Sequence, residues 1–139
     1  MRIMAIDYGE ARTGVAISDA LGMLAGYTTV IHSWRRETVV EELTRLVKEH
    51  QVTELVLGYP KNMNNSLGEK AQTCQALAEE LKERTGLPVS LWDERLTTVD
   101  AHRILHANGR KSKKHRQNVD AVAATLILEG YLARKNGGI

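Results

Sequence analysis

The 139-residue sequence has one cysteine, two prolines and no phenylalanine, and its apolar runs are short. The single cysteine, Cys74, excludes an internal disulfide, and no Cys/His cluster has the ligand spacing of a zinc site. Asp7 interrupts the first apolar run too early for a signal-peptide core, and no run approaches the roughly 18 residues of a membrane span. These absences predict a cytoplasmic protein.

Charge is nearly balanced overall but concentrated in one place. Lys and Arg number 19 against 17 Asp and Glu, a net charge of +2. The segment from Ala101 to Val119 contains no acid, so the rest of the chain carries 13 basic against 17 acidic residues. A basic patch on an otherwise acidic domain indicates nucleic-acid binding, although a solvated lysine-rich loop explains a charge run equally well. The basic residues of this segment are Arg103, Arg110, Lys111, Lys113, Lys114 and Arg116.

Hydrophobic periodicity predicts an α/β fold in which a five-stranded mixed sheet is flanked by helices. The first three strands are expected to form an antiparallel meander, because glycines separate the first two and short connections join them all. Nothing in the sequence suggests a repeat or a linker, so residues 1–139 are expected to form one domain. Strands are predicted at 2–8, 15–19, 26–33, 54–59 and 88–93, and helices at 37–50, 69–84, 97–108 and 120–135.

Asp7 is the first candidate for chemistry. In a strand, Asp7 shares a face with Ile3 and Ala5, where a carboxylate is costly unless a cation pairs with it. The alternative interpretation is that Asp7 opens a tight turn with Gly9 and accepts hydrogen bonds from backbone amides.

A second acidic pair, Asp93 and Glu94, ends the fifth predicted strand at the carboxyl edge, where open α/β sheets place their ligands. Adjacent strand residues face opposite sides, so only one of the two is expected to share a site with Asp7. A solvated acidic pair beside Arg95 is an equally acceptable interpretation of this spacing.

Asp120 falls in the first turn of the last predicted helix, where the helix dipole favours a negative charge whatever the function. Together with Asp7 and the pair at 93–94, however, it makes three acids at element ends that one topology can gather. Clustered carboxylates repel one another and persist by binding hard cations such as Mg²⁺ or Mn²⁺. Two such ions about 4 Å apart suit the hydrolysis of a phosphodiester bond.

Four segments resemble the YqgF family of nucleases, which is linked to 5′-end processing of small-subunit ribosomal RNA precursors and related to Holliday-junction resolvases. Together they span nearly the whole chain and form a highly specific set of motifs. The segments are DYGEARTGVAISD, GYPKNMNNSLG, DERLTT and KSKKHRQNVDAVAATLIL.

The resemblance implies a ribonuclease H-like fold and a divalent-metal site formed by Asp7, Glu94 and Asp120, and so selects Glu94 over Asp93. It also implies that Arg95, Thr97 and Thr98 position a phosphate. The hydroxyl of Thr97 is equally well explained as the cap of a helix. The expected substrate is either structured RNA, namely a ribosomal RNA precursor, or branched DNA. A monomer or a homodimer is expected to bind it. The basic residues expected to contact it are Arg110, Lys111, Lys113, Lys114 and Arg116.

Two other functions stay open on the sequence alone. The run DYGEARTG also looks like the first phosphate-binding hairpin of the actin, heat-shock-ATPase and sugar-kinase superfamily, although that architecture needs two facing domains. Alternatively, the basic loop binds nucleic acid without catalysis and the acids serve only as caps and turns. Within the nuclease interpretation, a metal site does not distinguish RNA from DNA, because substrate choice depends on surrounding contacts such as those to the 2′-hydroxyl.

Overall fold

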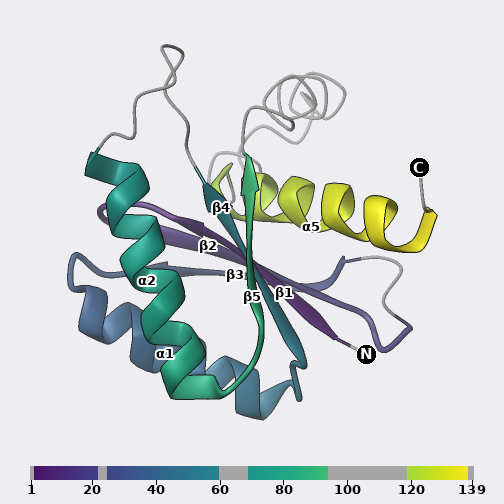
Figure 1. Ribbon diagram of the computed structural model, residues 1–139, viewed down its shortest axis with the longest axis horizontal. Coiled ribbons are helices and arrows are strands. Elements are labelled where there is room, and N and C mark those ends of the chain that lie inside the picture. Colours follow the sequence, from purple (N-terminus) through teal and green to yellow (C-terminus); the bar gives the residue numbers. More distant parts are fainter. Residues whose placement is uncertain (1, 22–24, 60–68, 94–118, 138–139) are drawn as a thin grey trace.

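The computed structural model describes residues 2–21, 25–59, 69–93 and 119–137. They include a five-stranded mixed sheet with strand order β3-β2-β1-β4-β5 (Figure 1). The first three strands pair antiparallel, whereas β1, β4 and β5 run parallel to one another. This arrangement confirms the predicted meander and mixed sheet. The strands are β1 (Ile3–Tyr8), β2 (Arg12–Ser18), β3 (Ala25–His32), β4 (Glu54–Tyr59) and β5 (Val89–Asp93).

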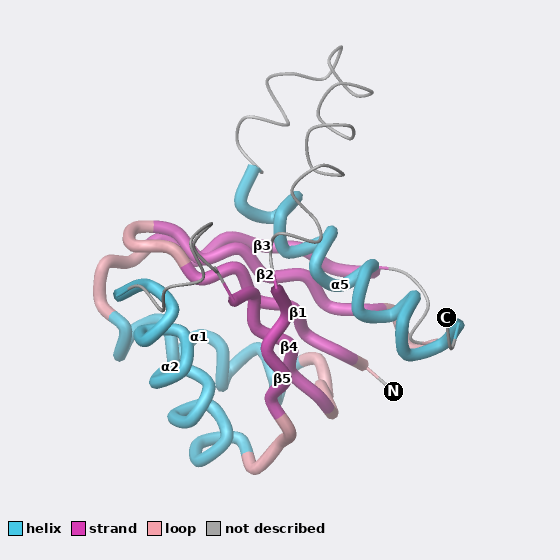
Figure 2. The backbone as a smooth tube through the Cα atoms, turned by 45° about the horizontal axis from the view of Figure 1, so that its top comes forward, coloured by secondary structure: helices cyan, strands magenta, loops and turns pink. Residues whose placement is uncertain are grey.

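The helices lie on both faces of the sheet. Helices α1 (Arg36–Glu49) and α2 (Glu69–Thr85) cover one face, and α5 (Val119–Gly137) covers the other (Figure 2). Their bounds agree with the predicted helices within two residues. The helix predicted at 97–108 and the basic loop that follows it lie outside the described residues. Within the described segments, every helix is too short or too polar to span a lipid bilayer.

Strand alternation divides the interior into two cores. Met4 and Ile6 of β1 pack in the core beneath α1 and α2, and Ile3 and Ala5 pack in the core beneath α5. Because side chains alternate along a strand, Asp7 belongs to the α5 face. The sequence predicted this shared face for Ile3, Ala5 and Asp7.

Helix α5 is attached to the sheet through its C-terminal half. The Tyr131 hydroxyl and the Lys135 ammonium both donate hydrogen bonds to the carboxylate of Glu54, the first residue of β4. Helix α5 therefore runs against the direction of β4, and its first turn lies toward the carboxyl ends of the parallel strands (Figure 1). Near the other end of the helix, Ala124 is small and fully buried, which lets the helix pack closely on the sheet.

Helix α2 ends just before a glycine, and Pro88 follows two residues later. Gly86 adopts φ +71°, and its N–H donates to the carbonyl of Lys82 at 2.9 Å. A glycine in this left-handed conformation closes a helix without the strain that a Cβ would bring.

Candidate active site

Asp7 lies within β1, in the antiparallel ladder with β2, where it pairs with Gly14. The turn comes later, after Tyr8, and depends on Gly9, where a Cβ would come within 2.4 Å of the Arg12 carbonyl oxygen. The interpretation of Asp7 as a turn-opening residue is therefore wrong, because the ladder continues past it. Asp7 is half-buried, and in the part of the chain that the structure describes no hydrogen bond or ion pair reaches its carboxylate. This leaves a carboxylate on a core face with its charge available to a ligand.

Both strands beside Asp7 present a glycine at its level. Gly14 is its partner in β2, and the β1–β4 register, which pairs Ile6 with Leu57, brings Gly58 level with Asp7 on the other side. Paired residues of neighbouring strands face the same side, so neither neighbour places a side chain beside the carboxylate. Glycine inside a strand often marks a point where a ligand or another backbone approaches closely.

Asp120 is the second residue of α5, the helix that covers the face carrying Asp7. Because α5 starts toward the carboxyl ends of the parallel strands, the structure brings position 120 and Asp7 to the same edge and the same face. The first turn of a helix also favours a negative charge.

Asp93 ends β5, where it pairs with Tyr59. Trp92 belongs to the core beneath α5, so alternation assigns Asp93 to the opposite face, away from Asp7. The expectation that only one acid of the 93–94 pair shares the Asp7 site stays a prediction. Glu94 itself lies outside the described residues, as do the predicted substrate contacts Arg95, Thr98, Arg110, Lys111, Lys113, Lys114 and Arg116.

Two basic residues near Asp7 were not singled out from the sequence. Arg12 pairs with His32 across β2 and β3, and both side chains are exposed. Gly14 pairs with Asp7 and so shares its face. Arg12, two residues before Gly14, and its partner His32 therefore lie on that face as well. Strand alternation could have placed Arg12, but His32 becomes its neighbour only through the pairing of β3.

Tyr8 follows Asp7 and packs on the opposite face, against the core beneath α1 and α2. Burial raises the pKa of Tyr8, although the positive charge of Arg36 opposes that effect. The phenol therefore stays protonated at neutral pH and adds no charge beside Asp7. Among the described residues, no three His, Cys, Asp or Glu side chains are grouped closely enough to hold a metal ion.

A family model described as "RuvX: Holliday junction resolvase" matches residues 1–134. The chain belongs to the RuvX family. This confirms the resemblance drawn from the four sequence motifs, since YqgF and RuvX denote the same family.

Curated relatives of this RuvX chain match it over nearly its whole length. A protein of Desulfitobacterium hafniense is 46% identical over 99% of this chain and 97% of its own, and one of Listeria innocua is 45% identical over 98% and 100%. Both carry the name "Putative pre-16S rRNA nuclease".

Solved structures share the fold at much lower identity. Thermus thermophilus RuvC in complex with a Holliday junction substrate is 13% identical with a TM-score of 0.67, covering 99% of this chain and 96% of that one. The fowlpox virus Holliday junction resolvase is 12% identical with a TM-score of 0.62, covering 98% and 99%. At these identities the likeness shows the fold alone, which confirms the predicted ribonuclease H-like class.

Proposed function

We propose that this RuvX chain is a divalent-metal-dependent nuclease that hydrolyses phosphodiester bonds in the cytoplasm, with residues 1–139 forming one domain. Asp7, Glu94 and Asp120 are its proposed metal ligands and catalytic carboxylates. The single observation that carries the proposal is the half-buried Asp7 carboxylate, which stands between two glycines at the edge where α5 begins.

The donor chemistry of this edge fits a hard cation. Asp7 shares its face with fully buried Ile3 and Ala5, and a carboxylate in such surroundings is stabilised by a nearby positive charge. Carboxylate oxygens are the preferred protein ligands of Mg²⁺ and Mn²⁺. When bound, two such ions would supply an activated water and stabilise the leaving oxygen.

The chain's own residues determine how substrate reaches this edge. Helix α5, fixed to the sheet through Glu54, holds position 120 beside the strand ends, and the glycines at 14 and 58 leave the space next to Asp7 clear of side chains. Arg12, on the same face, adds positive charge beside the acidic edge, where it can attract a phosphate backbone, and His32 lies next to it as its partner in β3.

The proposed substrate is a precursor of 16S ribosomal RNA, which the names of the bacterial relatives specify, and the proposed position of cleavage is its 5′ end. The second candidate is a four-way DNA junction, favoured by the family's description and by the RuvC complex that shares the fold. A resolvase must cut two strands, so a dimer would favour the junction and a monomer the RNA.

A cleavage assay with Mg²⁺ or Mn²⁺ tests the proposal on structured precursor RNA, linear DNA and four-way junctions side by side. The parent is expected to cut the RNA, and Asp7→Asn is expected to abolish cleavage while leaving the circular dichroism spectrum unchanged.

Without metal, Asp7→Asn should be at least as stable as the parent, because one of several mutually repelling carboxylates is gone. Cleavage by Asp7→Asn at the parent rate would remove Asp7 from the mechanism. Binding without cleavage of any substrate would favour a non-catalytic nucleic-acid module.

A further inference from the structure

The loop between β3 and α1 lies at the same edge of the sheet as Asp7. Strands β1 and β3 are both antiparallel to β2, so they run in the same direction and end at the same edge. The N–H of Ser33, just after β3, donates to the carbonyl of Ala11 in the β1–β2 turn at 3.0 Å. This hydrogen bond joins the loop to the turn that follows Asp7.

The next residue, Trp34, is 77% exposed. Its backbone is nonetheless held in place, because the N–H of Arg35 donates to Ser33 Oγ at 3.1 Å and the carbonyl of Arg35 accepts the N–H of Val39 at the start of α1. The other tryptophan, Trp92, is only 9% exposed and packs beneath α5. Trp34 thus presents a large aromatic ring to water on a backbone that is already ordered.

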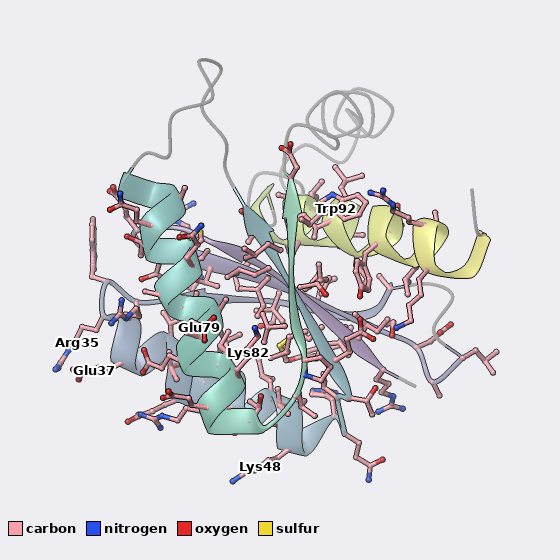
Figure 3. The ribbon with its side chains drawn as sticks, viewed as in Figure 1. Arg35, Glu37, Lys48, Glu79, Lys82 and Trp92 are labelled. Atoms are coloured by element: carbon pink, nitrogen blue, oxygen red, sulfur yellow. The ribbon has the colours of Figure 1, made fainter. Side chains whose placement is uncertain are left out.

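Arginines lie next to Trp34 in the chain and on the strand that pairs with β3. Arg35 extends from the start of α1, and its ion pair with Glu37 is 3.5 Å long with both side chains more than three-quarters exposed, so the pair is weak (Figure 3). Arg12 and His32 are a cross-strand pair of β2 and β3. Along the strand direction this pair lies between the level of Asp7 and the position of Trp34. Arg36, in contrast, forms an ion pair with Glu80 of α2 at 3.4 Å, so its charge is already paired.

We propose that Trp34 and Arg35, together with Arg12 and His32, bind an unpaired stretch of the nucleic-acid substrate. This inference rests on the proposed nuclease function and specifies how its substrate is held. The indole stacks on a base, and the basic groups contact the phosphates that lead to the acidic edge, a combination typical of single-strand binding. Two strand spacings, roughly 10 Å, separate β1 from β3, so the stacked base lies a few nucleotides from the bond that is cut.

The chain's two tryptophans make this proposal directly measurable. In metal-free buffer, which prevents cleavage, a ten-nucleotide oligouridine is titrated against the parent protein and tryptophan emission is followed. Stacking on Trp34 should quench the emission of the exposed indole and leave the buried Trp92 unaffected. Trp34→Ala should lose the quenching and weaken binding roughly 5- to 150-fold, whereas Trp34→Phe, which keeps an aromatic ring, should retain most of the affinity.

Matched controls come from the opposite edge of the sheet. Tyr27→Ala removes an exposed ring near the amino end of β3, and Lys48→Ala removes an exposed charge in the last turn of α1 (Figure 3). Neither should change affinity. Arg35→Ala should lower the slope of log affinity against log salt by about 0.7, the value for one single-strand phosphate contact.

Equal affinity and equal quenching for the parent and Trp34→Ala would overturn the inference. If cleavage is normal in that case, the nuclease proposal stands without it. If Trp34-dependent binding is found but no substrate is cut, the inference stands and the nuclease proposal fails. A parent protein that binds none of oligouridine, structured RNA and a four-way DNA junction overturns both.

Discussion

Gly130 of α5 lies against the indole ring of Trp92 in β5: a Cβ at position 130 would come within 2.9 Å of Trp92 Cζ2. Glycine inside a helix is less favourable than alanine by about 1 kcal/mol. The close approach of helix to sheet explains why glycine is required here nonetheless. This contact shows how closely α5 approaches β5 at position 130.

Gly130→Ala should therefore destabilise the fold, although alanine is the better helix former. Overpacking a rigid ring costs about 1–3 kcal/mol, which outweighs the helical gain and leaves a net loss of about 1 kcal/mol in the free energy of unfolding. Urea denaturation measures this loss. In a Trp92→Leu background the obstructing ring is absent, so Gly130→Ala should become neutral or stabilising. The same loss in both backgrounds would show that the ring is not the cause.

Glu54 attaches the C-terminal half of α5 to the sheet and should make the free energy of unfolding depend on pH. Burial raises the pKa of Glu54, but the hydrogen bonds from Lys135 and Tyr131 more than offset it, so its pKa lies below the ordinary value. A lowered carboxyl pKa contributes stability above the unfolded-state pKa, about 4.3, and this contribution disappears as pH falls through the folded-state value.

The parent should accordingly be more stable than Glu54→Gln at pH 7, and the difference between them should shrink below about pH 4.3. Denaturation curves from pH 7 to pH 3 test this. Glu83→Gln, which removes an exposed carboxylate on α2, serves as the control and should stay parallel to the parent. A difference between the parent and Glu54→Gln that does not vary with pH would mean that the charge of Glu54 contributes nothing to the attachment of α5.

Thr13 of β2 is fully buried, and its hydroxyl has no hydrogen-bond partner in the part of the chain that the structure describes. A buried hydroxyl without a partner costs about 1–3 kcal/mol, and valine has nearly the same shape. Thr13→Val should therefore raise the free energy of unfolding by about 1 kcal/mol. Thr44→Val is the comparison, because the Thr44 hydroxyl donates to the Val40 carbonyl at 2.7 Å and its loss should bring no gain. Equal effects of the two changes would argue against an unsatisfied hydroxyl at Thr13.

Much of the fold could be predicted because its signals are local. Alternation of Ile3, Ala5 and Asp7 identified their shared face, and hydrophobic periodicity placed the helix at 69–84 within one residue of the observed α2. The turn interpretation of Asp7 was wrong because Asp followed closely by Gly is typical of turns, whereas pairing with Gly14 keeps Asp7 in the strand. Only the register of β1 with β2 decides whether Asp7 lies in a turn or in the strand.

The surroundings of Asp7 could not be predicted, since they depend on which strands become neighbours. The insertion of β4 between β1 and β5 brings Gly58 beside Asp7, and the pairing of β3 brings His32 beside Arg12. Local sequence also gives no indication that Trp34 is exposed, because tryptophan is usually largely buried.

The two acids that follow one another at the end of β5 should differ sharply in their effect on cleavage. Trp92 faces α5, so Asp93 faces away from Asp7, and alternation predicts that the next position returns to the face of Asp7. Glu94→Gln should therefore be as damaging as Asp7→Asn, and Asp93→Asn much less so, in single-turnover cleavage with Mg²⁺ or Mn²⁺. The reverse ranking would show that the family motif has been transferred to this chain one position out of register.

The basic segment 110–116 lies outside the described residues, but its charge makes a quantitative prediction of its own. It immediately precedes α5, the helix that carries Asp120, so its lysines are expected to contact phosphates on either side of the cut bond. Replacing Lys111, Lys113 and Lys114 with alanine should lower the slope of log affinity against log salt by about 2 to 3 units, because each phosphate contact contributes roughly 0.7 to 0.9. The loss should be similar for all sequences, since phosphate contacts position the strand without reading its bases.

Binding over a salt series, measured in an Asp7→Asn background to prevent cleavage, isolates this contribution of the basic segment. Lys48→Ala and Lys82→Ala are the matched controls, because these lysines end the helices that precede β4 and β5 and so lie at the amino ends of those strands, away from Asp7. Metal binding should be unaffected by all of these lysine changes, since the proposed ligands are carboxylates elsewhere in the chain. Equal slopes for the triple variant and its background would mean that the segment is only solvated, and that phosphate binding depends on the basic residues around Trp34 instead.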